Sequence, residues 1–228
     1  MNNCVIGKKS VNLQISYVCN VHKEMKVAII KYNAGNIFSV INAVKRLGIE
    51  PVLTDDAEQL LSADRVIFPG QGEAHNAMTY LRERGLDRLI KDLKQPVLGI
   101  CIGQQLLCSH SEEGDTDCLG VFPMDVKKFR PVCHEDKIPQ MGWNSLTFRN
   151  GENGKGGLFD GLHDEDFVYF VHSYYVPLHE EYTIATAHFT LDYSAALHKD
   201  NFYATQFHPE KSGRVGETIL RNFININS

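Results

Sequence analysis

Short apolar runs and amphipathic helical patterns alternate along the chain from Met25 to about Leu107. The run Val27–Ile30 is typical of a strand that is buried on both faces. Apolar residues then recur at helical spacing, and Gly48 stands where a helix would end. Further strands are expected at about 51–53, 65–68 and 96–100, and further helices at about 74–84, 86–93 and directly after Cys101. This alternation over short connections indicates a mostly parallel sheet with helices on both faces.

The pattern changes from about Leu119 onward, where strand-like runs follow one another without long helical patterns between them. These runs are 121–122, 143–148, 167–176, 182–189 and 201–207, and a closing helix is expected at about 214–223. Strands in direct succession are typical of antiparallel ribbons. The predicted fold class is therefore α/β, a mostly parallel open sheet flanked by helices, with antiparallel strands added in the C-terminal half.

Residues 1–24 do not take part in this alternation. Residues 11–18 could form a short strand, but no turn or helix pattern follows before Met25. The segment also lacks the apolar stretch that a secretory signal contains. We therefore expect residues 1–24 to be a poorly ordered N-terminal extension, or Met25 to be the true start, and residues 25–228 to form one domain.

The amino-acid composition argues against some classes of partner and favours one cellular compartment. Of the 228 residues, 43% are hydrophobic and 22% are charged, which is ordinary for a globular protein with a sizeable core. The net charge of −5 gives no basic excess for nucleic acid, and no stretch reaches the roughly 18 apolar residues of a membrane span. The six cysteines and ten histidines show no paired ligand spacing, so no metal site is predicted. Free thiols are expected, which favours a reducing cytoplasm.

The sharpest motif is Gly99-Ile100-Cys101-Ile102-Gly103, between a strand-like run and a helical pattern. A nucleophile between two glycines at a strand-to-helix turn is typical of a nucleophile elbow, here with cysteine in place of serine. Small neighbours are needed because the turn is tight, and the helix N-terminus favours a thiolate. The backbone N–H of Ile102 is placed to bind an oxyanion. The alternative is a buried structural cysteine in an ordinary turn.

A base for this thiol is predicted at His208, in Gln206-Phe207-His208-Pro209-Glu210. Residues two apart in extended chain point to the same side, so His208 and Glu210 can project together. A carboxylate beside a histidine fixes its tautomer and stabilises the imidazolium, as in a catalytic triad. His172 is the main rival as base, but it has no carboxylate two positions on.

With both motifs, the chain resembles the class I, triad-type glutamine amidotransferases, which have a flavodoxin-like fold. Within this family it is most similar to the glutaminase subunits of imidazole glycerol phosphate synthases, over about 25–223. The segments that carry the resemblance are 32–36, 69–72, 99–107, 141–144, 171–174 and 208–212. The chain departs from the pattern at residues 1–24, which have no counterpart, and at Gln140, where histidine or a similar residue is expected.

The resemblance implies that the protein hydrolyses glutamine to glutamate and ammonia through a glutamyl thioester, without metal or organic cofactor. Cys101 would be the nucleophile, His208 the base and acid, and Glu210 the residue that orients His208. The substrate-binding residues would be Gln105, Glu113 and Ser173, although Glu112 stands beside Glu113. The oxyanion residues would be Gly70, Gly72 and Ile102.

The resemblance also implies a heterodimer with a separate cyclase subunit, a TIM barrel, which uses the ammonia to make imidazole glycerol phosphate in histidine biosynthesis. A (β/α)₈ barrel takes about 250 residues, and none remain in this chain. The side chains expected near the partner or the ammonia route are Trp143, Asn144, Tyr169, His172 and Lys211.

Three other functions stay open. The first is a sister glutaminase, such as that of anthranilate or aminodeoxychorismate synthase. The second is a cysteine hydrolase of the same fold, which turnover of peptides rather than glutamine would reveal. The third is a non-catalytic binding subunit, which would not react with a glutamine-like electrophile.

Overall fold

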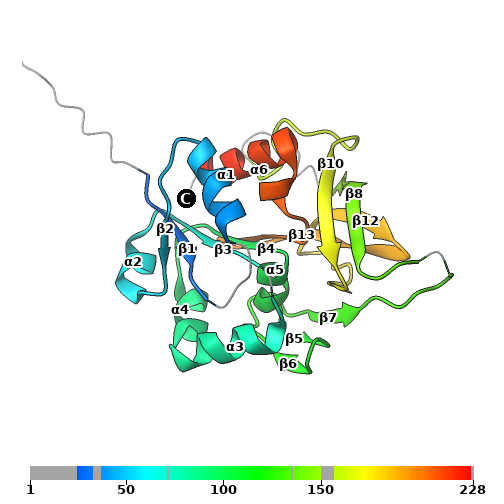
Figure 1. Ribbon diagram of the computed structural model, residues 1–228, viewed down its shortest axis with the longest axis horizontal. Helices are drawn as coiled ribbons and strands as arrows, with labels where there is room; N and C mark the ends of the chain where they lie inside the picture. Colours follow the sequence, from blue (N-terminus) through cyan, green and yellow to red (C-terminus); the bar gives the residue numbers. More distant parts are fainter. Residues whose placement is uncertain (1–24, 33–36, 71, 135, 150–156, 227–228) are drawn as a thin grey trace, which may run out of the picture.

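An eight-stranded mixed sheet forms the centre of the computed structural model, in the order β2-β1-β3-β4-β14-β13-β12-β9 (Figure 1). The structure describes residues 25–32, 37–70, 72–134, 136–149 and 157–226. The expectation for residues 1–24 therefore lies outside the described residues. Five strands run parallel to one another, namely β1 (Val27–Ile30), β2 (Val52–Thr54), β3 (Arg65–Phe68), β4 (Val97–Ile100) and β14 (Phe202–Thr205). Their order is that of a flavodoxin-like doubly wound sheet.

Helices cover both faces of the parallel strands, as the sequence pattern predicted. One face carries α1 (Phe38–Arg46) and α6 (Gly213–Asn225). The opposite face carries α2 (Ala57–Ser62), α3 (Ala74–Glu83), α4 (Leu86–Asp92) and α5 (Ile102–Leu107). Alternate residues of one strand therefore enter different cores: Val27 and Ile29 pack with α1 and α6, and Ala28 and Ile30 pack on the other side.

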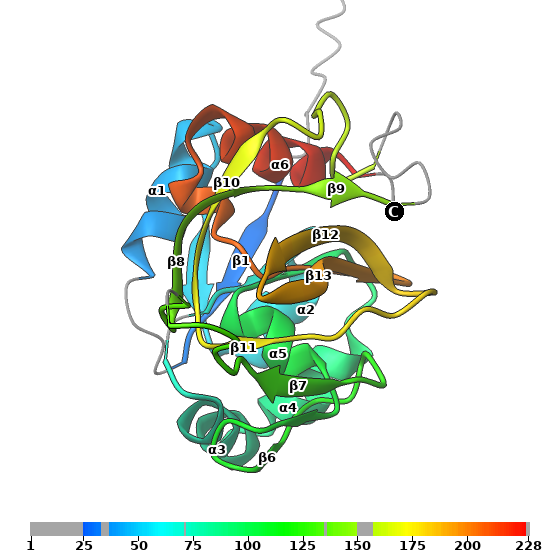
Figure 2. The ribbon, with the colours of Figure 1, turned by 90° about the vertical axis from the view of Figure 1, so that its right-hand side faces the viewer.

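Antiparallel strands extend the sheet in the C-terminal half, which confirms the second part of the predicted fold class. The main sheet gains β13 (Leu191–Lys199), β12 (Thr183–Phe189) and β9 (Thr147–Phe148). A separate two-stranded ribbon consists of β8 (Gln140–Ser145) and β10 (Phe167–His172), which lie side by side at one end of the main sheet (Figure 2). A small sheet contains β11 (Tyr174–Tyr175), β7 (Asp125–Lys128), β5 (His110–Ser111) and β6 (Thr116–Asp117).

Two strand predictions differ from the structure. The expected strand at 121–122 is a bend, and the strand begins only at Asp125. Phe122 is fully buried in the core beneath α5, its N–H bonds to Leu107 O, and Pro123 has no N–H for a ladder. The expected run at 167–176 is divided into β10 and β11 at Ser173. The long strand β13 had no counterpart among the predicted runs.

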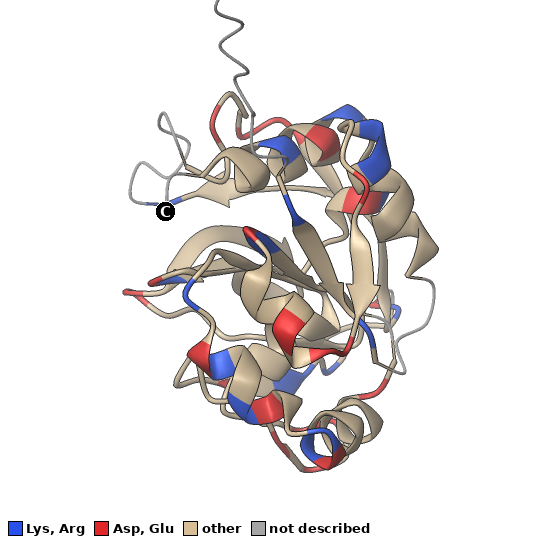
Figure 3. Cartoon of the chain, turned by 90° about the vertical axis from the view of Figure 1, so that its left-hand side faces the viewer, with Lys and Arg blue, Asp and Glu red and all other residues tan. Residues whose placement is uncertain are grey.

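Charged residues of both signs are mixed over the helices and loops of the side drawn in Figure 3, where the strands are largely uncharged. No helix among the described residues is both long and apolar enough to cross a membrane.

Candidate active site

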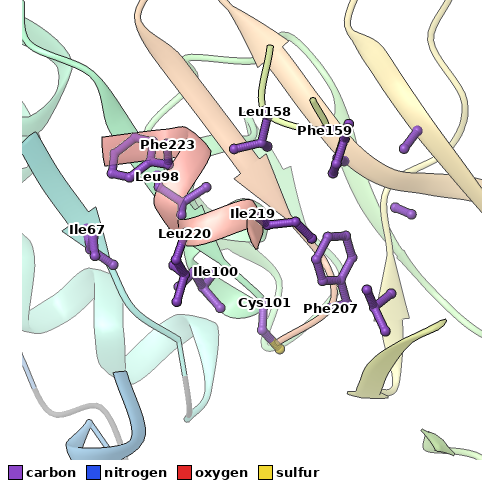
Figure 4. Close-up of a cluster of buried hydrophobic side chains, with 14 of the residues drawn as sticks. Ile67, Leu98, Ile100, Cys101, Leu158, Phe159, Phe207, Ile219, Leu220 and Phe223 are labelled. Atoms are coloured by element: carbon purple, nitrogen blue, oxygen red, sulfur yellow. The ribbon is translucent and has the colours of Figure 1, made fainter. Parts of the chain in front are cut away.

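Cys101 sits at the turn between β4 and α5, in backbone space that a non-glycine residue rarely occupies. Its φ is +53° and ψ is −109°, and its N–H bonds to Thr205 O at 2.7 Å. A Cβ on Gly103 would lie 2.2 Å from Phe68 O, so only glycine fits there. Figure 4 shows Cys101 at the margin of the hydrophobic cluster, beside Ile100 and Phe207. This is the strained, close-packed turn expected of a nucleophile elbow.

His208 and Glu210 form a buried pair next to this turn. His208 Nδ1 lies 2.7 Å from Glu210 Oε1, and the two side chains are 1% and 2% exposed. The pair was predicted from extended chain, but Glu210 belongs to the short 3₁₀ helix η1 (Pro209–Lys211), and this turn brings its carboxylate back toward the imidazole. The N–H of His208 bonds to Tyr169 O at 2.9 Å. Ser212 completes the frame, since it donates to His208 O and accepts from the N–H of Tyr169.

The charge of Cys101 reaches His208 and changes its protonation. Burial by itself lowers the pKa of His208, but the Cys101 thiolate and the hydrogen bond and charge of Glu210 outweigh it and raise that pKa to about 10. His208 Nε2 has no hydrogen-bond partner among the described residues, so the influence of Cys101 is mainly that of its charge. His208 is therefore an imidazolium near neutral pH, with Cys101 on one side of the ring and Glu210 on the other.

A cavity of about 460 Å³ opens at Cys101 and His208. Nearly all the residues predicted for the catalytic and substrate-binding pocket line this cavity. Its lining consists of Gly70, Gly72, Cys101, Ile102, Gln105, Glu113, Pro139, Val171, His172, Ser173, Tyr174, His208 and Lys211. Glu210 is not in this lining, in keeping with its place behind His208.

The structure distinguishes the two neighbouring glutamates that the sequence left ambiguous. Glu113 lines the cavity, and its Oε2 accepts a hydrogen bond from the N–H of Ala74 at 2.9 Å. Burial raises the pKa of Glu113, although the Ala74 N–H acts in the opposite direction. Glu112 instead accepts from the N–H of Lys128 on β7, which holds it outside the cavity.

Gln206 is a site residue that the sequence analysis missed. It is fully buried, and its Nε2 lies 3.7 Å from Cys101 Sγ. Its Oε1 accepts from Gln105 Nε2 at 3.0 Å, and that amide also donates to Tyr174 O. A weak signal was present, because Gln206 lies only two residues before the predicted base, but Gln206 and Phe207 form a bend that the sequence pattern does not predict.

The residues predicted to lie near the partner do not form one surface. Trp143 of β8 and Tyr169 of β10 are opposite each other in the ribbon, with ring centroids 5.9 Å apart, and Trp143 is 57% exposed. Asn144 faces the main sheet instead, where its Nδ2 donates to His188 O. Lys211 lines the cavity.

His172 is buried at the end of β10 and also lines the cavity. Its Nδ1–H donates to Tyr174 O at 2.7 Å, while its Nε2 has no partner among the described residues. Burial lowers the pKa of His172 to about 4, against the effect of the Tyr174 carbonyl, so this imidazole is neutral. An imidazole with so low a pKa is a weak base, and His172 has no carboxylate partner, so it is a poor rival to His208.

The elbow, the base and the flavodoxin-like order together define a class of protein. A family model for class I glutamine amidotransferases matches residues 28–226, and the chain belongs to this family.

Individual relatives show which members of the family the chain is similar to. The chain is 59% identical over 202 residues to imidazole glycerol phosphate synthase subunit HisH of Bacteroides thetaiotaomicron, covering 89% of this chain and 100% of that protein. It is 46% identical over 201 residues to the subunit of the same name from Pectobacterium atrosepticum, covering 88% of this chain and 99% of that one. A solved structure of a glutamine amidotransferase matches with a TM-score of 0.66 at 20% identity, over 87% of this chain and 97% of that one. The structural likeness supports the fold.

Proposed function

We propose that this chain is the glutamine-hydrolysing subunit of an imidazole glycerol phosphate synthase, in which Cys101, His208 and Glu210 act as the catalytic triad. The observation that carries the proposal is the buried His208–Glu210 pair beside the strained Cys101, opening into one cavity. The names of the relatives at 59% and 46% identity support the pathway.

The reaction begins when the Cys101 thiolate attacks the side-chain carboxamide carbon of glutamine. A tetrahedral oxyanion forms, and backbone N–H groups at Ile102 and in the loop at 69–72 stabilise it. The His208 imidazolium donates its proton to the leaving nitrogen, so ammonia departs and a glutamyl thioester remains. His208 then accepts a proton from water, which hydrolyses the thioester to glutamate and restores the thiolate. Glu210 holds the imidazole in the tautomer that this cycle needs.

The residues around Cys101 favour the amino-acid end of glutamine as the bound group. The Glu113 carboxylate lies in the cavity wall and would attract the substrate's α-ammonium group. The backbone near Ser173 would bind the substrate's carboxylate, and Gln105 would close this part of the pocket. Gln206, buried beside Cys101 Sγ, would keep Gln105 in place.

The relatives are named as subunits of a synthase, which implies a partner subunit. We infer that the partner is a TIM-barrel cyclase that forms a heterodimer with this chain. The exposed apolar side of the β8–β10 ribbon, formed by Met141, Trp143 and Phe167, offers the contact surface. A sheltered route matters because ammonia in bulk water near neutral pH is mostly protonated and no longer nucleophilic. We place the protein in the cytoplasm, in keeping with the free thiols of Cys101, Cys108 and Cys118.

The test is to measure glutamate formation from glutamine by the chain alone, with the cyclase, and with the cyclase plus its nucleotide ligand. We expect little activity alone and the highest rate in the full complex. Equal rates in all three would reject the coupling but keep the hydrolase. A rate near zero in all three would reject the hydrolase itself, and activation by an anthranilate synthase partner instead would favour the sister glutaminase.

A further inference from the structure

Tyr32 contacts the loop that is proposed to bind the oxyanion. It lies two residues after the end of β1 and is 6% exposed, and its hydroxyl donates a hydrogen bond to Pro69 O. Its ring packs edge-on against Phe68, with ring centroids 5.5 Å apart. Tyr32 therefore holds the chain where β3 leads into the loop.

The Tyr32 hydroxyl remains a donor throughout the reaction. Burial raises its pKa well above the ordinary value of tyrosine, and the charge of Cys101 raises it further. The hydroxyl therefore keeps its proton while Cys101 is a thiolate. The effect of Cys101 also places Tyr32 within electrostatic reach of the nucleophile.

The same loop is packed tightly against the nucleophile turn. A Cβ on Gly70 would lie 2.2 Å from Ile100 O and 2.6 Å from Ile102 N. The Pro69–Gly70 peptide therefore has no spare room beside the turn, and Tyr32 holds its carbonyl oxygen. Because Ile102 N–H is a proposed oxyanion donor, a shift of this peptide would disturb both sides of the oxyanion hole.

We propose that Tyr32 is a positioning residue for glutamine hydrolysis. Its hydroxyl fixes the Pro69–Gly70 peptide against the turn at Cys101, and so holds the start of the oxyanion loop in place. This inference rests on the proposed glutaminase function. Oxyanion donors are effective only when they are already in place as charge develops. Without the hydroxyl, the Pro69 carbonyl loses a buried partner, and the Pro69–Gly70 peptide can rotate.

The variant Tyr32→Phe keeps the ring and removes only the donor. In the complex with the cyclase and its nucleotide ligand, we expect kcat for glutamine hydrolysis to fall roughly tenfold, the effect of one lost buried hydrogen bond, with KM within about twofold. Tyr80→Phe, on helix α3, is the matched control. It also removes a tyrosine hydroxyl, one that donates a hydrogen bond to Asp55 Oδ2 at 2.9 Å. Its kcat should equal that of the wild type.

Iodoacetamide distinguishes a misplaced loop from a damaged thiol. Its reaction with a thiolate is a displacement at saturated carbon and develops no oxyanion, so Cys101 of Tyr32→Phe should be alkylated at the wild-type rate. Equal losses in alkylation and hydrolysis would overturn the inference, as would a wild-type kcat or a loss in KM alone. A wild-type complex that does not hydrolyse glutamine would defeat the proposed function instead.

Discussion

The proposed nucleophile, Cys101, and its proposed base, His208, come from two regions of the molecule that are built differently. Cys101 follows β4, a parallel strand whose four residues are all buried, and its turn packs against the neighbouring parallel strands at Thr205 O and Phe68 O. His208 leaves the last parallel strand and is held by Tyr169 of the antiparallel ribbon, 39 positions earlier in the chain. Ser212 links His208 to Tyr169, because its hydroxyl donates to His208 O and accepts from the Tyr169 N–H.

This difference indicates which of the two regions can shift when a partner binds. The turn at Cys101 is packed between the ends of β3 and β14, where a Cβ on Gly103 would clash with Phe68 O. The position of His208 relies on contacts with a ribbon whose outer side is exposed, with Trp143 and Met141 on it. We therefore expect the region around the ribbon, rather than the parallel half, to respond to a partner.

Replacing the nucleophile should have the largest effect. Cys101→Ala removes the group that forms the thioester, so glutamine hydrolysis in the full complex should fall roughly 10⁴-fold or more. His208→Ala should lose a similar amount, because the two act as a unit. Cys133→Ala, at an exposed thiol, is the control and should keep full activity. Substantial glutaminase activity in Cys101→Ala would remove this residue from the mechanism.

Glu210→Gln should cost less, with a loss of rate roughly a hundredfold smaller than that of Cys101→Ala. Its distinctive effect is on His208, whose raised pKa depends in part on the Glu210 carboxylate. A titration of the imidazole by NMR should show proton loss near pH 10 in the wild type and at lower pH in the variant. An unchanged titration would contradict the pairing.

The same shift makes a prediction for stability. A pKa raised above the ordinary value of 6.5 stabilises the fold fully below that pH, and the contribution is lost as the pH rises through about 10. The free energy of unfolding of the wild type minus that of Glu210→Gln should therefore shrink over this range. Urea denaturation at several pH values measures it, and a difference that grows with pH would reverse the assignment.

Trp143→Ala tests whether the exposed side of the β8–β10 ribbon binds the cyclase. Because this side chain is 57% exposed, its removal should leave the melting temperature nearly unchanged. Affinity for the cyclase should fall roughly tenfold or more if Trp143 is an interface anchor. Val52→Ala, at a 49% exposed residue on the opposite edge strand β2, is the matched control. Equal binding by wild type and Trp143→Ala in a titration would move the interface elsewhere.

Deleting residues 1–24 should have the smallest effect. The relative from Bacteroides thetaiotaomicron aligns over its whole length with only 202 residues of this chain. We expect the melting temperature to stay within about 2 °C and the glutaminase rate to stay unchanged. A large drop in either quantity would mean that these residues are packed against the domain.

Secondary structure was predictable where side-chain pattern and burial agree. The parallel strands are apolar on both faces, so β1, β3 and β4 were visible as short runs. The helix end at Gly48 was also visible, and its φ of +83° is one that glycine adopts at little cost. In contrast, β13 contains Ser194, Ala195 and Ala196, residues with weak strand preference. They are fully buried because β12 and β14 flank them.

Sequence alone predicted the fold class, from the alternation of strand and helix patterns along the chain, and it predicted the turn at Cys101 and the pairing of His208 with Glu210 from residues that lie close together in sequence. Only the tertiary structure decided that Glu113 rather than Glu112 lines the cavity. Only it revealed that Gln206 contacts Cys101 and that His172 is neutral. These facts depend on desolvation and on contacts between segments up to about a hundred residues apart, and one-dimensional spacing carries no information about either.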